Sequence, residues 1–306
     1  MHARHVPETI FFRWAIKELA GRLDCEPTVE AVLAAREKNP PEVFASRVLR
    51  EANVTAVLVD YGHQTGETWS HAEHARHLPC RVLPVLRLET FAQELILRHD
   101  RFETFVDAFV AGVEGARAGG SVALKSIIAY RTGLAVQPTT AADAGAAFGA
   151  VREQARRDGR IRLAVKPLND YLLLRALESA ARQSLPVQFH TGFGDPDVDL
   201  LGANPLHLRP LLEKDAYRTV AFVLLHASYP YVRDSATWRP FIGTSMPTSV
   251  SPTRTWRRRS RPCYASSSVS RRRARCSIRA TRPPSRSCSG SRRGGAAGAW
   301  ASCSTS

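Results

Sequence analysis

Five short apolar segments, separated by longer stretches of helical character, constrain the fold of this chain most strongly. Each segment has the length and the continuous hydrophobicity of a strand that is covered on both faces of a sheet. The stretches between them leave room for crossover helices. The sequence therefore predicts βα units around a parallel sheet, with strands at residues 54–60, 81–88, 121–128, 186–190 and 220–226.

The intervening stretches carry helix signals. Phenylalanine and valine residues recur three and four positions apart in residues 102–113, which places them on one face of a helix. Pro40 and Pro41 predict a break between two helices near the N-terminus. Helices are expected at residues 6–24, 28–51, 102–113, 141–158 and 168–183. An open doubly wound sheet and part of a (β/α)₈ barrel both fit this order, and the absence of a Gly-x-Gly-x-x-Gly motif argues against a dinucleotide enzyme.

The composition changes abruptly near Asp234. Residues 235–306 contain 15 arginines and no Asp, Glu, Lys, Leu, His, Asn or Gln. The whole chain has 43 basic and 28 acidic residues and a net charge of +15, so residues 1–234 hold 28 of each and are formally neutral. We therefore expect two parts: an α/β body at 1–234 and an Arg/Ser/Pro-rich, disordered basic tail at 235–306.

Two interpretations of the tail follow from this composition. A GC-rich gene that is read out of frame gives mostly Arg, Ser, Pro, Ala and Cys, as here. Back-translation with GC-rich codons and a shifted frame can yield an amphipathic helix and then the strand-like "KVLYSSDA". A frameshift after about residue 234 is therefore our first hypothesis. The alternative is a basic arm that binds nucleic acid non-specifically by neutralising phosphates.

The cysteine and hydropathy patterns indicate a compartment. Cys25 and Cys80 are the two cysteines of the body, which fits a reducing environment. No apolar run reaches the roughly 18 residues that a membrane helix needs, and no secretory leader is recognisable. We expect a cytoplasmic protein with no membrane association.

Histidine ends two of the expected strands, at His190 in "PVQFH" and His226 in "FVLLH". Functional groups gather at the carboxyl ends of the strands in parallel α/β folds. Two imidazoles that converge there could bind a divalent metal, although each could instead be a hydrogen-bonded structural residue. Lys125 lies inside an apolar strand, where an amine is costly to bury unless it is paired or reaches solvent. Asp195 belongs either to a substrate loop or to a solvated turn.

Three stretches together resemble the amidohydrolase-related family: "LKSIIAYRTGL" (124–134), "QFHTGFGDPDVDL" (188–200) and "LLHASYPYVR" (224–233). Members of that family are metal-dependent enzymes with a TIM-barrel fold, and the branch in question accompanies glutamine synthetase-like domains. The resemblance covers roughly residues 5–234. It implies that the five strands correspond to the second to sixth of an eight-stranded barrel, so that about five of eight βα units are present.

The resemblance also implies roles for individual residues. His190 and His226 match metal-ligand histidines, and Lys125 matches the position of a metal-bridging lysine. The implied cofactor is a divalent metal, with zinc as the expected ion. Arg131, Asp195 and Tyr229 lie in the matching stretches and are expected to contact a small-molecule substrate or the groups around the metal.

Two parts of the family's pattern are missing. The expected His-x-His motif has no match, since His2 and His5 are spaced differently and follow no strand. The expected aspartate of the last strand is missing as well, because no Asp follows Asp234. We therefore expect a metal-dependent hydrolase of C–N amide-type bonds that is truncated at the N-terminus and inactive as this chain. A decarboxylase of the same superfamily and a nucleic-acid-binding protein are the alternatives.

Overall fold

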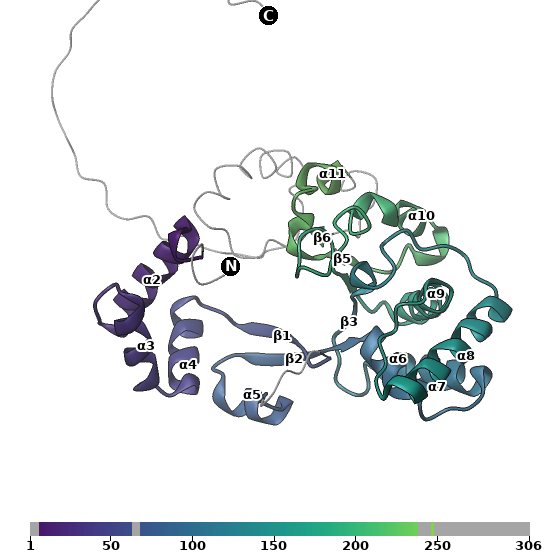
Figure 1. The fold of residues 1–306 in the computed structure, drawn as a ribbon, viewed down its shortest axis with the longest axis horizontal. Helices are drawn as coiled ribbons and strands as arrows, with labels where there is room; N and C mark the ends of the chain where they lie inside the picture. The colour runs from purple at the N-terminus through teal and green to yellow at the C-terminus, as the bar shows by residue number, and fades with distance from the viewer. Residues whose placement is uncertain (1–5, 63–67, 238–245, 248–306) are drawn as a thin grey trace, which may run out of the picture. The chain divides into compact units, whose positions relative to one another are not determined.

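The computed structural model describes residues 6–62, 68–237 and 246–247. Its centre is a parallel sheet in which the strands follow one another in chain order from β1 to β6 (Figure 1). The strands are β1 (Ala56–Asp60), β2 (Arg81–Arg87), β3 (Ala123–Ser126), β4 (Val187–Phe189), β5 (Phe222–Leu224) and β6 (Met246–Pro247).

The sequential order decides between the two architectures that the sequence left open. A doubly wound sheet reverses its strand order at a switch point, whereas strands of a (β/α) barrel are neighbours in the order in which they are synthesised. The described strands show no reversal from β1 to β6. The chain therefore has the α/β architecture of an incomplete barrel, as predicted.

Helices connect the strands. The α-helices are α2 (Ile10–Leu23), α3 (Val29–Glu37), α4 (Pro41–Glu51), α5 (His71–His77), α6 (Leu88–Ile96), α7 (Phe102–Gly115), α8 (Ala141–Asp158), α9 (Lys166–Gln183), α10 (Arg209–Leu212) and α11 (Val232–Thr237). The 3₁₀ helices are η1 (Val6–Glu8), η2 (Ile128–Tyr130), η3 (Pro205–Leu208), η4 (Asp215–Tyr217) and η5 (Leu225–Ser228). Helix α7 packs against α6, α8 and α9 (Figure 1).

Local sequence signals explain where several helices begin and end. The hydroxyl groups of Thr9, Thr28 and Thr140 each accept a hydrogen bond from the backbone N–H three residues later, which caps α2, α3 and α8. Pro41 occupies the first turn of α4, where no N–H is needed. Gly159 ends α8 in the left-handed conformation. The predicted break at Pro40–Pro41 is confirmed.

One face of the sheet is packed against the helices. Successive strand residues point to opposite faces. Five residues on the helical side of β3, β4 and β5 are at most 1% exposed: Leu124, Val187, Phe189, Phe222 and Leu224. The Phe189 and Phe222 rings stack with centroids 5.5 Å apart. This face, together with α6 to α9, forms the hydrophobic core.

The opposite face is the inner face of the barrel wall and is covered less completely. Arg87, Lys125, Gln188 and Val223 are register partners across β2 to β5, so their side chains form one row on this face. Leu58 of β1 lies on the same face and is 51% exposed. The inner face therefore combines polar groups with apolar surface that the described residues leave open to solvent.

The strands and helices agree with the sequence-based prediction in type but differ at their ends. All five predicted strands are present, each shorter than predicted. Leu88 was assigned to a strand, but it begins helix α6, which the sequence analysis did not separate from the apolar run before it. The short strand β6 was not predicted, and it pairs with β5.

Most of the basic tail lies outside the described residues. Helix α11 runs across residue 234, and only Ser235–Thr237 and Met246–Pro247 of the tail are described. The division at that residue, the disorder of the tail, its out-of-frame origin and its binding of nucleic acid all stay predictions.

The described residues also bear on two general expectations. None of the helices in this part of the chain is both long and apolar enough to cross a bilayer. Cys25 and Cys80 carry free thiols. The cytoplasmic location stays a prediction.

Candidate functional site

His190 and His226 meet at the carboxyl ends of neighbouring strands. His190 directly follows β4, and His226 follows β5 by two residues, within η5. Their ring centroids lie 4.5 Å apart. His190 is 5% exposed, and its Nε2 atom has no hydrogen-bond partner among the described residues. The structure thus brings together the two histidines that the sequence singled out, while their role as metal ligands stays a prediction.

An unusual backbone conformation places His226. His226, Ala227 and Ser228 all have positive φ angles, of 61°, 49° and 55°, a conformation that costs non-glycine residues energy and must be held by its surroundings. Thr191, the residue after His190, supplies part of that support. Its hydroxyl group donates to the Leu225 carbonyl at 2.7 Å and lies 2.9 Å from the Ser228 hydroxyl. The two histidine-bearing loops are therefore joined by buried hydrogen bonds.

The environment of both histidines disfavours their protonation. Burial lowers the pKa of His190 to about 3, and the charges of His226 and Lys125 contribute. Burial and the Lys125 charge also lower the pKa of His226, against the opposing effect of Asp195. Both imidazoles are accordingly neutral at pH 7, the form in which a ring nitrogen can accept a proton or ligate a metal.

Lys125 lies in the middle of the inner face, on β3. It is 9% exposed as a whole residue. Burial lowers the pKa of Lys125 to about 8, with the Asp60 charge opposing that shift. Asp60 itself is engaged by Arg87, with 2.6 Å between Oδ2 of Asp60 and an Arg87 guanidinium nitrogen. Asp60 and Arg87 were not singled out from the sequence.

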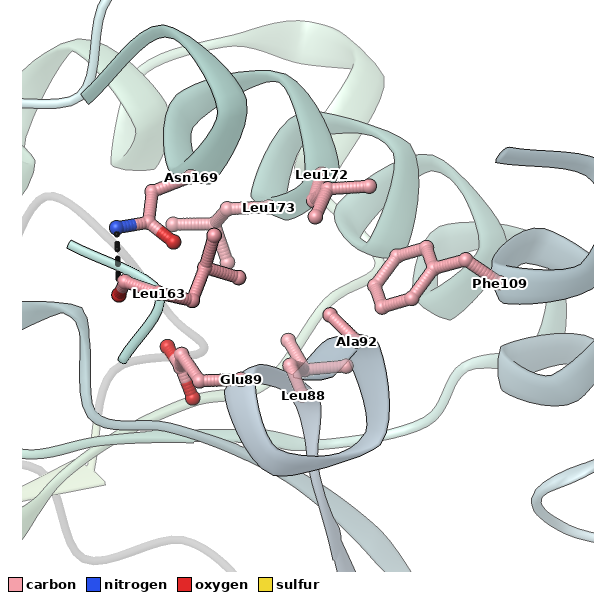
Figure 2. A pocket seen from close by; sticks show the side chains of 8 residues that line it. All are labelled: Leu88, Glu89, Ala92, Phe109, Leu163, Asn169, Leu172 and Leu173. Carbon is pink, nitrogen blue, oxygen red and sulfur yellow. Dashed lines mark hydrogen bonds between the residues drawn. The ribbon is translucent and has the colours of Figure 1, made fainter. Parts of the chain in front are cut away.

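Glu89 is a buried carboxyl group that sequence reasoning also missed. Its Oε1 atom accepts hydrogen bonds from the Ser126 hydroxyl at 2.7 Å and the Ile127 N–H at 3.0 Å, whereas Oε2 has no partner among the described residues. Burial raises the pKa of Glu89. Its side chain faces Leu163 and Asn169 across an apolar pocket (Figure 2). Glu89 therefore holds the end of β3 by hydrogen bonds to the two residues that follow Lys125, and it does so from the helical side of the sheet.

Tyr130 and the loop after β4 cover His190. The Tyr130 ring centroid lies 4.3 Å from that of His190, and the Tyr130 hydroxyl accepts a hydrogen bond from the Asp195 N–H at 3.1 Å. A Cβ atom on Gly194 would overlap the Tyr130 hydroxyl and lie 2.7 Å from His190 Nε2. The absence of a side chain at residue 194 thus lets the backbone of this loop pass close to Tyr130 and to the unpartnered Nε2 atom.

The three other predicted site residues lie around this group. The Asp195 side chain is exposed and influences the pKa of Tyr130 and His226. Arg131 follows η2, and its Nε atom is buried without a hydrogen-bond partner in the described part of the chain. Tyr229 is 46% exposed, and its ring contacts that of Phe193. A contact of these residues with a substrate stays a prediction.

The residues present do not by themselves fit a bound zinc or other divalent ion. Zinc sites use three or four protein ligands, whereas the described residues contain no group of three or more His, Cys, Asp or Glu side chains placed to hold a metal. Nε2 of His190 is free to ligate, but Lys125 in its ammonium form has no lone pair to offer. Two imidazoles therefore constitute an incomplete ligand set.

The known proteins that resemble this chain match only part of its length, and the matches cover only part of theirs. No family model matches the chain. Protein FluG of Emericella nidulans is 41% identical over 145 residues, which cover 44% of this chain and 16% of FluG. This chain thus corresponds to a small part of that protein.

Two crystal structures resemble the fold. A protein from Lactobacillus casei ATCC 334, provisionally assigned as a metal-dependent hydrolase, has a TM-score of 0.67 and 31% identity, and the match covers 75% of this chain and 60% of that one. The uronate isomerase of Thermotoga maritima has a TM-score of 0.50 and 17% identity, over 76% of this chain and 58% of that one. The second likeness concerns the fold alone. This chain spans about three fifths of the Lactobacillus protein.

Proposed function

We propose that this protein derives its site from an amidohydrolase-like, metal-dependent hydrolase of C–N amide-type bonds, and that the polypeptide described here has no turnover. The observation that carries the proposal is the His190–His226 pair at the carboxyl ends of β4 and β5, with a buried and unpartnered Nε2 atom on His190. The likeness to the Lactobacillus protein supports the metal-dependent class of chemistry.

The expected lack of turnover follows from the side chains present. Two imidazoles are too few to hold a catalytic metal. His190 also cannot replace it as a general base, because an efficient base has a pKa near the working pH, whereas that of His190 is about 3. The remaining groups can bind and orient a small molecule.

Metal uptake tests the proposed site. The purified chain is dialysed against zinc and then against buffer, and bound zinc is measured by elemental analysis. We expect less than one zinc per chain, and less still for His190→Asn and His226→Asn. The matched control is His207→Asn, which removes an exposed histidine from η3 and should leave uptake unchanged. Uptake that is equal in all four proteins would contradict the site.

An activity assay tests the absence of turnover. The chain is incubated with zinc, manganese or cobalt and a panel of N-acyl amides, and released amine is measured. We expect no release above that of His190→Asn. Metal-dependent release that His190→Asn abolishes would overturn the inactivity, although it would support the hydrolase assignment.

A further inference from the structure

The inner face carries a positive charge, on Lys125, that has no direct ion-pair partner among the described residues. Lys125 is 9% exposed and forms no hydrogen bond or ion pair with another described residue. A lysine that is mostly buried is solvated less well than one at the surface, so its ammonium group gains from a direct anionic partner. Its persistence at the centre of a strand-end site therefore indicates a ligand.

Both acidic groups near Lys125 stabilise its charge from a distance, but each of them forms its hydrogen bonds with other groups. Asp60 accepts hydrogen bonds from Arg87 Nε at 2.8 Å and from the Gly62 N–H at 2.9 Å, so the Asp60–Arg87 pair is neutral as a unit. Glu89 is held by Ser126 and Ile127 on the other side of β3. Among the described residues, no carboxylate is therefore in direct contact with the Lys125 amine.

The neighbouring polar groups suit a small anion. Arg87, Lys125 and Gln188 stand side by side on β2, β3 and β4, and His190 follows Gln188 by two residues toward the open end. The Gln188 amide and the histidine N–H groups can donate hydrogen bonds without adding charge. One ammonium group with neutral donors matches a singly charged carboxylate. A phosphate carries nearly two negative charges, which a single ammonium group would match only in part.

We infer that Lys125 binds the carboxylate of a small-molecule ligand on the inner face, with His190 and His226 facing the remainder of that molecule. This rests on the proposed function and deepens it, because it names the class of small molecule that the site binds. In this proposal Lys125 contacts the ligand and does not bridge metal ions, which agrees with the incomplete set of metal ligands.

Ligand-induced stabilisation measures this binding, because a ligand that binds only the folded state raises the melting temperature. The probes are benzoate, its neutral analogue benzamide and inorganic phosphate, each with EDTA present. We expect benzoate to raise the melting temperature of the wild type, and benzamide and phosphate to raise it much less. Lys125→Met should weaken benzoate binding by about tenfold or more, since it removes a charge-assisted contact.

Two further variants complete the design. Lys38→Met removes an exposed lysine after α3 and should respond to benzoate like the wild type. Lys125→Arg retains the charge and should retain part of the response. Lys125→Met should itself fold at least as stably as the wild type without ligand, because it replaces an unpaired buried charge by an apolar side chain of similar length.

The inference is overturned if benzoate stabilises Lys125→Met as much as the wild type, or if benzamide or phosphate is as effective as benzoate. A large loss of ligand-free stability in Lys125→Met would overturn it too, since it would reveal an internal partner of the amine. Because EDTA is present throughout, these outcomes are independent of zinc uptake. Failure of the metal site and failure of the carboxylate site can therefore be told apart.

Discussion

The rings of His190 and His226 lie 4.5 Å apart, centroid to centroid, although one follows β4 and the other follows β5. This distance is close to the separation of about 4.8 Å between paired strands. His190 lies one residue beyond the register pair of Phe189 and Leu224 and His226 lies two, so the left-handed backbone at His226 contributes to the approach of the rings as well as the strand pairing. The two side chains share a buried, electropositive environment with Lys125. Their titration should therefore influence the stability of the fold.

Stability should decrease as the pH falls below 6.5, in part because of His190. Its pKa in the folded chain is about 3, against an ordinary value of 6.5, so between these values the unfolded chain binds a proton that the folded chain does not. The free energy of unfolding then falls with decreasing pH, by up to about 1.4 kcal/mol per pH unit for a single group. Urea unfolding at pH 5 to 8 measures this slope.

The variant His190→Asn should have a flatter slope between pH 6.5 and 5 than the wild type. His207→Asn, which removes an exposed histidine, is the control and should keep the slope of the wild type. Equal slopes for wild type and His190→Asn would show that the imidazole of His190 is not shielded in the folded chain.

Glu89 should produce a pH dependence of the opposite sign. Burial raises its pKa above the ordinary value of 4.5, so the folded chain retains a proton that the unfolded chain releases. Its contribution to stability is therefore present below pH 4.5 and is lost as the pH rises through the raised value. Glu89→Gln should abolish this loss, as seen in the free energy of unfolding at successive pH values, whereas Glu94→Gln on the exposed side of α6 should not.

Removing the Glu89 side chain should cost more than neutralising it. Glu89→Ala leaves the Ser126 hydroxyl and the Ile127 N–H without their acceptor, and each buried group without a partner costs about 1–3 kcal/mol. Glu89→Gln keeps an oxygen at the Oε1 position and should be the milder change. Equal losses in the free energy of unfolding for the two variants would argue against an acceptor role for Oε1.

Gly194 should tolerate no side chain. A Cβ atom there would lie 2.7 Å from His190 Nε2 and would overlap the Tyr130 hydroxyl, so Gly194→Ala should displace these rings and lose about 1–3 kcal/mol of stability. The matched control is Gly149→Ala on α8, where a Cβ atom meets nothing within 4 Å. That variant should gain about 0.5–1 kcal/mol, because alanine suits a helix interior better than glycine. Urea unfolding and the NMR signals of His190 measure both effects.

The sequence predicted those features that depend on local patterns. The apolar runs identified the strands. The two strand-end histidines were expected to lie close together, because parallel strands bring their carboxyl ends together, and the structure places them side by side. Asp60 and Arg87 escaped notice because their pairing depends on the register of β1 and β2. The strand order, which excludes a doubly wound sheet, likewise depends on pairing between distant segments.

Other features have no clear local signal. The left-handed conformation of His226, Ala227 and Ser228 occurs without a glycine and is supported by Thr191 from another loop. Helix α6 begins at Leu88, directly after β2, within one apolar run. Hydrophobicity alone cannot locate the change from strand to helix in such a run. Glu89, at the second position of this helix, was missed for the same reason.

The two faces of the sheet should respond very differently to the same substitution. Leu124 on the helical face is fully buried, whereas Leu58 on the inner face is 51% exposed. Leu124→Ala should cost about 2–5 kcal/mol, because it removes packed methyl groups and leaves a cavity. Leu58→Ala should change stability by no more than about 0.5–1 kcal/mol, because solvent already reaches that side chain. Since both leucines lie within parallel strands, any difference between them reports burial rather than strand propensity. Urea unfolding of the two variants measures that difference, and a loss at Leu58 as large as at Leu124 would mean that the inner face is covered in solution.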